Sequence, residues 1–316
     1  MRICSLLPSA TEIVLALGLG DHLVAVTHEC DLPPGARPVP VITHSTVDHG
    51  TRGSREIHTH VTAAAHRGSS IYALDQELLE RLDPDIVLTQ ELCDVCAVSY
   101  DQVAEAVHRL DAKVPGQRTV LSLEPKGLAG ILDVIEQVGD VTGVPERSAA
   151  LIRELKTRLD RVVAVAAGAT TRPRVFAMEW LDPPYSAGHW VPEMIRLAGG
   201  HDEMSREGVP SVEVSWAQIA AYDPEIILLM PCSFSLERTL EELGRIALPI
   251  VWSRLAAVKA GRAYAVDAAV YFSRSGPSTI DGLEILGEII HPELFPRRSS
   301  ADAWRPLGAA SGPLGR

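Results

Sequence analysis

One motif occurs twice, and this repeat constrains the fold more than any other feature of the chain. Segments Leu82–Thr89 and Tyr222–Leu229 both carry Asp-Pro, then an acidic residue and a mostly apolar run. A second pair of similar segments, Glu12–Gly18 and Glu193–Gly199, precedes them in the same order. Because both echoes keep their order along the chain, we predict two similar α/β lobes.

The two lobes differ in length because of one polar segment. The first echo is offset by 181 residues (193 minus 12) and the second by 140 (225 minus 85), so the N-terminal lobe is about 41 residues longer between these two segments. Residues 43–70 account for much of this difference, and they hold five of the 11 histidines. We interpret 43–70 as a solvated His-rich insertion with a helix from Ser54 through Ala65.

The order of the elements predicts parallel sheets. A short apolar strand at Arg2–Leu7 leads into a helix at Glu12–Leu17 and a second strand at Leu23–Thr27. Such a β-α-β start implies parallel pairing. Residues 148–167 form a long amphipathic helical pattern without proline or glycine. We therefore predict an N-terminal lobe at 1–145, a linker helix at 146–168, a C-terminal lobe at 169–297 and a disordered tail at 298–316.

Charge and hydropathy exclude several classes of partner. The net charge of −12 argues against nucleic acid and against anionic membrane, since both need clustered Lys and Arg. Neither a secretory signal nor a run of roughly 18 apolar residues is found, so we expect a cytoplasmic protein that does not insert into membranes. Nucleotide-binding and nucleophile-elbow motifs are also missing, which favours binding over catalysis.

Aromatic side chains gather in one short segment. Only 5% of the chain is aromatic, yet Trp180, Tyr185 and Trp190 lie within 11 residues, together with Pro183–Pro184 and His189. They follow a predicted strand, and ligands of open α/β sheets bind beyond the carboxyl ends of strands. We interpret the segment as a stiff loop that displays a stacking surface for a flat ligand, or else folds onto its own core.

The histidine of this segment has three possible roles. His189 could be an axial ligand to a metal centre in a macrocycle, a hydrogen-bond donor to the ligand, or a side chain that braces the loop. Arg274, which follows the last predicted strand, could meet an acidic ligand group or pair with Asp281.

Cysteines form a second group of candidates. An odd number of cysteines, five, in a large chain favours thiols or a metal site over a disulfide framework. Cys93 and Cys96 form a Cys-x-x-Cys pair after a strand, and a soft metal could add two of the ligands that follow other strands: His28, Cys30 and Cys232. Metal or redox chemistry, thiols that contact a ligand, and inert buried thiols all remain open.

Several short motifs resemble one family throughout residues 1 to about 297. The chain is similar to the vitamin B12 substrate-binding proteins of ABC importers, in the helical-backbone metal-receptor family. The motifs that carry this resemblance are Arg2–Glu12, Gly18–Gly20, Leu82–Leu88, Ala198–Gly200, Ala257–Arg262 and Asp281–Glu284. The resemblance implies two Rossmann-like α/β lobes with parallel sheets, joined by a single long helix, with the ligand in a cleft between the lobes.

The resemblance also implies a function and a set of site residues. We expect non-catalytic binding of cobalamin or a related corrinoid; relatives carry haem, siderophores or metal ions. The expected walls and rim comprise Pro8, Ser9, Glu91, Cys93, Trp180, Tyr185, Gly188, His189, Trp190, Phe234, Phe272 and Arg274. The alternative is a zinc or Fe–S protein with redox or catalytic work, held by Cys30, Cys93, Cys96 and Cys232.

Two details bear on location and partners. The cysteine segment at 90–96 and the turn at Pro231–Cys232 are similar to a cytosolic branch of this family that binds cobalamin. The expected partners are the small-molecule ligand and either an ABC importer permease or a corrinoid-using protein.

Overall fold

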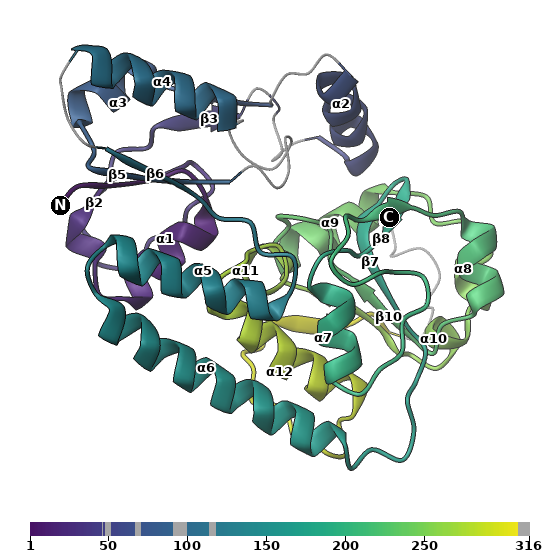
Figure 1. The fold of residues 1–316 in the computed structure, drawn as a ribbon. Helices are drawn as coiled ribbons and strands as arrows, with labels where there is room; N and C mark the ends of the chain where they lie inside the picture. The colour runs from purple at the N-terminus through teal and green to yellow at the C-terminus, as the bar shows by residue number, and fades with distance from the viewer. Residues whose placement is uncertain (46, 48–51, 67–70, 91–99, 114–117, 309–316) are drawn as a thin grey trace. The chain divides into compact units, whose positions relative to one another are not determined.

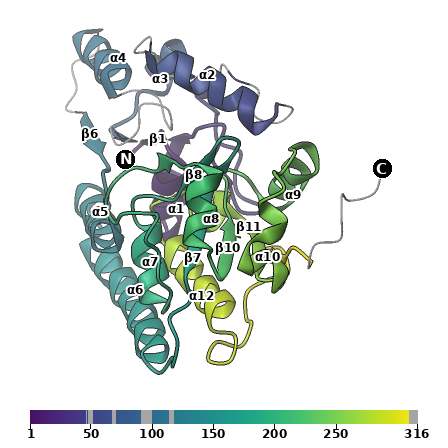
Figure 2. The ribbon, with the colours of Figure 1, turned by 90° about the vertical axis from the view of Figure 1, so that its right-hand side faces the viewer.

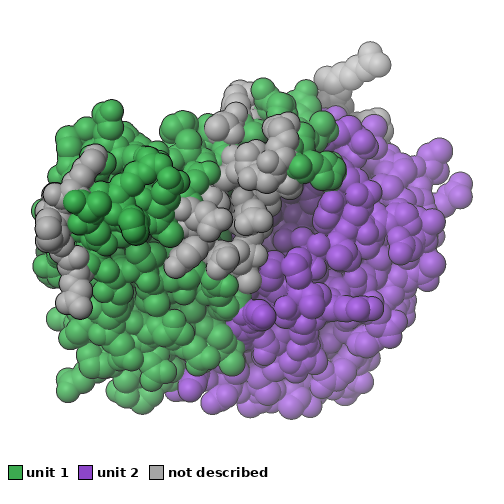
Figure 3. Space-filling view, turned by 45° about the horizontal axis from the view of Figure 1, so that its top comes forward, with its two compact units in different colours: residues 1–52, 56–125, 129–153 green, residues 53–55, 126–128, 154–316 purple. Residues whose placement is uncertain are grey.

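The chain folds into two compact units, each with its own sheet. The computed structural model describes residues 1–45, 47, 52–66, 71–90, 100–113 and 118–308. Unit 1 comprises residues 1–52, 56–125 and 129–153, and unit 2 comprises 53–55, 126–128 and 154–316 (Figure 3). Among the described residues, every helix is too short or too polar to cross a membrane.

Unit 1 is built on a four-stranded parallel sheet, as the β-α-β pattern predicts. Its strand order is β2-β1-β5-β6, with β1 at Ile3–Ser5, β2 at Leu23–Ala25, β5 at Ile86–Thr89 and β6 at Thr119–Ser122 (Figure 1). Its helices are α1 (Pro8–Ala16), η1 (Gly20–His22), α3 (Gln76–Leu82), α4 (Tyr100–Lys113) and most of α5 (Leu128–Val141). The residues of β1 and β5 are buried and almost all apolar, as expected for parallel strands of a sheet that is covered on both faces.

The predicted insertion has structure of its own. Strands β3 (Thr43–Ser45) and β4 (Tyr72–Leu74) form an antiparallel pair at its ends. The helix expected from Ser54 is present as α2, Ser54–His66. Gly53–Arg55, at the start of α2, pack as part of unit 2.

The long linker helix is present as α6, Pro145–Ala166. Its residues up to Arg153 belong to unit 1 and those from Glu154 onward to unit 2. In unit 2, Arg158 holds the helix against α12 (Ser278–Ile290) through ion pairs with Asp281 and, at 2.7 Å, with Glu284.

Unit 2 has a six-stranded sheet that is only partly parallel. Its order is β12-β11-β10-β7-β8-β9, and the central strands β11 (Ala263–Val266), β10 (Ile226–Leu229) and β7 (Val175–Leu181) are parallel. The outer strands β12 (Trp304–Pro306), β8 (Pro184–Ser186) and β9 (Val212–Glu213) add antiparallel pairs. The prediction of a parallel sheet is therefore correct for the centre of unit 2 and wrong for its edges.

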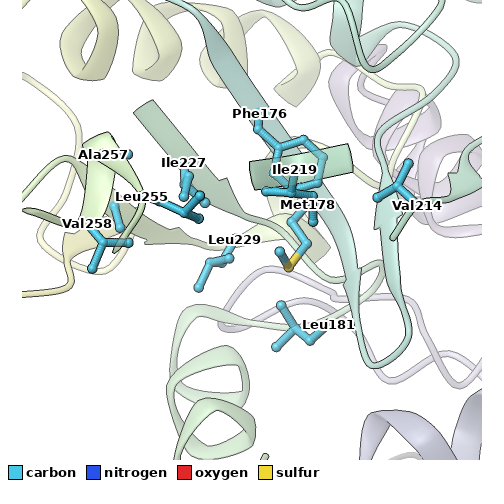
Figure 4. Close-up of a cluster of buried hydrophobic side chains, with 11 residues drawn as sticks. Phe176, Met178, Leu181, Val214, Ile219, Ile227, Leu229, Leu255, Ala257 and Val258 are labelled. Atoms are coloured by element: carbon cyan, nitrogen blue, oxygen red, sulfur yellow. The ribbon is translucent and has the colours of Figure 1, made fainter. Parts of the chain in front are cut away.

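Helices cover both faces of this sheet (Figure 2). Side chains of Phe176 and Met178 on β7 share a face with Ile227 and Leu229 on β10, because these residues are register partners. That face packs against α8 (Trp216–Tyr222) and the η2–α10 segment (Trp252–Lys259) through Ile219, Leu255, Ala257 and Val258 (Figure 4). The other helices of the unit are α7 (Val191–Leu197), α9 (Leu236–Arg245), α11 (Ala268–Tyr271) and α12.

The repeated motif forms the same turn in both units. Asp83 and Asp223 end their helices in the left-handed conformation, with φ of 40° and 44°. A proline follows each one, and it stops the helix because it has no amide hydrogen. The strand that leaves each turn then pairs with the first strand of its own unit, Ile86 with Ile3 and Ile226 with Val175.

One arginine holds each of these turns. The guanidinium of Arg2 donates to the carbonyl of Asp83 at 3.2 Å, and that of Arg174 donates to the carbonyl of Asp223, also at 3.2 Å. The main-chain amides of the two arginines donate in turn to the carboxylates of Asp85 and Glu225. This atomic agreement confirms the internal repeat that the sequence predicts.

The predicted tail is wrong for residues 298–308. Trp304–Pro306 forms β12, which pairs with β11, and the Trp304 indole packs edge-on against Tyr264 at 5.5 Å. Buried Glu288 accepts hydrogen bonds from the amides of Arg298 and Ser299. A glycine- and proline-rich composition suggested disorder, but one tryptophan and one buried carboxylate hold the segment. Residues 309–316 lie outside the described residues.

Candidate functional site

The aromatic segment is a β-hairpin rather than the stiff loop that its two prolines suggested. Strands β7 and β8 pair antiparallel, with Trp180 opposite Tyr185 and Leu181 opposite Pro184. Pro184 begins β8, a position where the missing amide hydrogen costs no ladder bond, and its carbonyl accepts from the amide of Val214 at 2.9 Å. We call residues Glu179–Trp190 the aromatic hairpin.

A bulge turns the Trp180 side chain out of the core. Met178 pairs with Ser186, and Trp180 pairs with Tyr185. The two partners on β8 are adjacent, whereas Glu179 separates Met178 from Trp180 on β7, so Glu179 is the extra residue of a β-bulge. Directly paired residues share a face, while Tyr185 and Ser186 point to opposite faces. Met178 therefore enters the core, and Trp180 and Tyr185 project together from the other face, where both are half-buried.

This hairpin is an addition to the repeated unit. The offset between the repeats is 172 at Arg2 and Arg174 (174 minus 2) and 181 at Glu12 and Glu193 (193 minus 12). Unit 2 thus carries nine additional residues between its first strand and the helix that follows it. Because unit 1 forms the equivalent strand and helix without such residues, they are candidates for a functional role.

Glu179 holds the C-terminal end of the hairpin, at Gly188, through its buried carboxylate. Its carboxylate accepts a hydrogen bond from the amide of Gly188 at 2.9 Å, and the Ser211 hydroxyl also bonds it. Burial raises the pKa of the Glu179 carboxyl above its ordinary value, and these two hydrogen bonds oppose that rise. A Cβ atom at Gly188 would clash with the backbone of Pro210 and Ser211, so glycine is required for the close approach.

His189 is held in a left-handed conformation with φ of 54°. Its amide donates to the carbonyl of Val209 at 2.7 Å, and its carbonyl accepts from the amide of Gly208 at 2.8 Å. These two bonds overdetermine a backbone conformation that non-glycine residues rarely adopt, a feature that clusters at functional sites. Burial lowers the pKa of the imidazole, which is therefore neutral at pH 7.

The loops after the three central strands meet at one edge of the sheet. We call residues 179–190, 230–234 and 267–274 the carboxyl edge of unit 2. The amide of Cys232 donates to the carbonyl of Glu179 at 3.0 Å, and the amide of Ser233 donates to the Ser273 hydroxyl at 3.0 Å. Ser233 has a φ of 62°. Together with His189, it is the second residue of this edge that adopts a positive φ without being glycine.

Three predicted aromatic contacts lie inside the edge. Trp190, Phe234 and Phe272 are each less than a tenth exposed. The Trp190 indole donates to the carbonyl of Phe272 at 2.9 Å, and the Phe234 ring packs edge-on against Trp180 at 5.4 Å. These rings support the hairpin, whereas Trp180 and Tyr185 keep part of their surface accessible. Direct ligand contact by Trp190, Phe234 or Phe272 stays a prediction.

The other predicted wall residues fall into two groups. In unit 1, Pro8 and Ser9 begin α1 directly after β1, and Ser9 is buried. In unit 2, Arg274 is half-buried before α12, and its carbonyl accepts from the Thr279 hydroxyl at 2.8 Å. Asp281, its predicted alternative partner, forms an ion pair with Arg158. Glu91 and Cys93 lie outside the described residues.

The described cysteines give no support to a zinc or Fe–S site. Within the part of the chain that the structure describes, no three His, Cys, Asp or Glu side chains converge as metal ligands. The Cys30 sulfur lies 3.1 Å from the hydroxyls of both Thr11 and Thr27, and Cys232 belongs to unit 2. Cys93 and Cys96 lie outside the described residues.

Sequence reasoning missed three residues that shape this site. Glu179, Ser54 and Glu242 carry no motif. Only the fold shows that Glu179 bonds Gly188, that Ser54 bonds Trp180, and that Glu242 bonds Ser54. An acidic residue directly after the apolar strand run at 175–178 is the one available signal for Glu179.

Curated relatives match nearly the whole chain. An ABC transporter substrate-binding lipoprotein of Bacillus subtilis is 26% identical over 93% of this chain and 81% of its own length. A vitamin B12-binding protein of Vibrio cholerae is 25% identical over 90% of this chain and 86% of its own length.

Solved structures share the two-lobed fold. A periplasmic haem-binding protein from Pseudomonas aeruginosa matches with a TM-score of 0.71 at 20% identity, covering 98% of this chain and 99% of its own. The periplasmic vitamin B12-binding protein BtuF of Vibrio cholerae matches with a TM-score of 0.65 at 23% identity, covering 92% and 96%.

A family model for periplasmic binding proteins matches residues 3–270. This match covers the four-stranded sheet of unit 1, the linker helix, every strand of the unit 2 sheet except β12, and most of the carboxyl edge of unit 2. The family consists of solute-binding proteins rather than enzymes, in agreement with the expectation of a non-catalytic chain. The chain therefore belongs to the periplasmic binding protein family.

Proposed function

We propose that the chain binds cobalamin or a related corrinoid on the face of the aromatic hairpin, as the substrate-binding component of an ABC importer. The observation that carries this proposal is the bulge at Glu179, which turns Trp180 away from the core and beside Tyr185. A half-buried indole and phenol on one face suit a wide, partly apolar ring with amide arms. The aromatic faces can stack on such a ring, and the phenol hydroxyl can bond the polar groups at its rim.

Two further observations support this ligand class. The Vibrio cholerae relative that is 25% identical is a vitamin B12-binding protein. The hairpin is also a segment that unit 2 has and unit 1 lacks, as expected for a binding surface added to a common template. An importer permease is the proposed protein partner, and a corrinoid-using protein is the other predicted one. The cytoplasmic location stays a prediction, and cell fractionation tests it.

Parallel titration with cyanocobalamin, cobinamide and haem tests the proposal. We expect the corrinoids to bind with a shift of their visible bands. Replacing Trp180 with leucine should weaken the binding about ten-fold, or ~1.4 kcal/mol, because the stacking face is lost while most apolar volume is kept. Isothermal titration calorimetry measures the affinity.

Trp216 supplies the matched control. It is also a half-buried tryptophan of unit 2, but it lies on α8, where it packs edge-on against Trp252 at 6.2 Å. Trp216→Leu should leave corrinoid affinity within two-fold of wild type. Equal losses in the two variants, or no corrinoid binding by the wild-type chain, would contradict the proposal.

Haem is the second candidate, and His189 favours it. Within the described residues, no hydrogen-bond partner is found for either ring nitrogen of His189, whose ring lies 5.7 Å from that of Trp190. A neutral imidazole of this kind can serve as an axial ligand to haem iron. Haem binding with a Soret shift that disappears in His189→Ala, without corrinoid binding, would decide for this candidate.

A further inference from the structure

Glu242 of α9 is a buried carboxylate with an unusual pair of partners. It is 1% exposed. One oxygen accepts from the guanidinium of Arg238 at 3.2 Å, and the other accepts from the main-chain amide of Ser54 at 2.6 Å. A buried charge is costly unless both oxygens are satisfied, so this arrangement requires the Ser54 peptide to stay in place.

Ser54 passes this constraint on to the aromatic hairpin. Ser54 is fully buried, and its carbonyl accepts a hydrogen bond from the indole nitrogen of Trp180 at 3.2 Å. The neighbouring Arg55 adds a second connection, because its guanidinium bonds both carboxylate oxygens of Asp182, one of them at 2.9 Å. Both connections belong to unit 2, with which Gly53–Arg55 pack.

Phe234 closes a ring of contacts. The guanidinium carbon of Arg238 lies 4.6 Å from the centre of the Phe234 ring, within cation–π distance. Phe234 in turn packs edge-on against Trp180 at 5.4 Å. The contacts thus run from Trp180 through Ser54, Glu242, Arg238 and Phe234 and back to Trp180, which we call the indole ring network.

We infer that Glu242 is a positioning residue that sets the orientation of the Trp180 indole, and with it the affinity for the ligand. This inference rests on the proposed function. Glu242 is too buried to touch a ligand, so it acts through Ser54 and Phe234, which hold the indole at its nitrogen and at its ring. The bulge leaves Trp180 outside the core, and the network supplies the support that core packing would otherwise give.

The Glu242→Gln variant tests the inference at two levels. Glutamine keeps the shape but turns an NH2 group toward one of two donors, so one contact of the network breaks. In ligand-free protein, the five tryptophans give five indole N–H resonances, and Trp180→Phe assigns the one of Trp180. We expect Glu242→Gln to displace the Trp180 resonance and to weaken cobinamide or cyanocobalamin binding about ten-fold, mainly through faster dissociation.

Glu288 provides a matched control. It is also a buried glutamate of unit 2, at 6% exposed, and it accepts from the indole nitrogen of Trp304 at 3.2 Å. Glu288→Gln should displace the Trp304 resonance alone and leave ligand affinity unchanged. If Glu242→Gln does not fold, Glu242→Asp takes its place, because it keeps the charge and shortens the side chain by one methylene.

The outcomes separate this inference from the proposed function. An unchanged Trp180 resonance in folded Glu242→Gln overturns the inference. A displaced resonance with unchanged affinity for a corrinoid that wild type binds also overturns it. If wild type binds no corrinoid, the proposed function fails, while a displaced Trp180 resonance still supports the network.

Discussion

At the scale of single residues, the hairpin depends on the carboxylate of Glu179, whose burial costs free energy because it loses contact with water. Glu179 lies at the bulge, and its partners are one main-chain amide and one hydroxyl, without an arginine or lysine among the causes that shift its pKa. The residue therefore trades stability for geometry. Natural proteins commonly accept such a cost at sites that bind a ligand.

The sign of this cost can be tested by pH. Because the folded-state pKa of Glu179 is raised, the folded protein binds more protons than the unfolded chain just above pH 4.5, so this residue destabilises the fold as pH rises. We expect Glu179→Gln to raise the free energy of unfolding more at pH 7 than at pH 4, because glutamine removes a buried charge that forms only as pH rises. Urea denaturation of both proteins at both pH values measures this difference. An equal effect at the two pH values would contradict it.

Residue identities near the hairpin were partly predictable. Trp180, Tyr185 and His189 stand out in the sequence because aromatic residues are scarce elsewhere, and all three lie at the carboxyl edge of unit 2. Glu242 and Ser54 were not predictable, since their bond joins residues 188 positions apart. Neither residue type nor spacing announces such a contact.

At the scale of elements, β12 shows how few residues can add a strand. Trp304 combines three contacts: its ring packs against Tyr264, the guanidinium of Arg297 lies 4.0 Å above it, and its nitrogen bonds Glu288. Together these hold a segment whose composition is typical of disorder.

Removing this side chain should loosen the edge of the sheet. We expect Trp304→Ala to lower the free energy of unfolding by about 2 kcal/mol, because apolar area is exposed and Glu288 loses a donor. Chemical denaturation measures the loss, and hydrogen exchange should show faster exchange at β11. Ile250→Ala is the control: this side chain is 77% exposed, so its removal should change stability by less than about 0.5 kcal/mol.

Element types followed the sequence patterns better than element edges did. Periodicity predicted α6, and the apolar runs of the repeated Asp-Pro segments form β5 and β10, because proline and burial act locally there. The hairpin was missed because Pro184 can begin a strand as well as prevent one. The bulge was missed because the extra residue is defined only by the partner strand.

At the scale of the whole molecule, two units use one structural template. Arg2 and Arg174 cap equivalent turns, and each bonds only groups of its own unit among the contacts described above. The order of the echoes predicted this template from the sequence. The nine extra residues of unit 2 were not noticed in the sequence, because they become visible only when the equivalent strands are known.

The template predicts equal and independent effects of two substitutions. Arg2→Ala and Arg174→Ala should each lower the free energy of unfolding by about 1 kcal/mol, because each removes the donor to two carbonyls at a helix end. These are the carbonyls of Leu82 and Asp83 in unit 1 and of Tyr222 and Asp223 in unit 2. The double variant should show the sum within about 0.5 kcal/mol, since the sites share no partner. Urea denaturation provides all three values. A double variant no less stable than either single one would contradict independent turns.

The bulge in β7, rather than side-chain chemistry alone, decides which face of the strand carries the Trp180 indole. In a regular strand, residues two apart share a face, so pairing β7 without the bulge would turn the Trp180 indole to the Met178 side of the strand while every residue stayed the same. Relatives that keep this spacing but pair the two strands without the bulge should therefore bind a different ligand, even where their aromatic residues are intact.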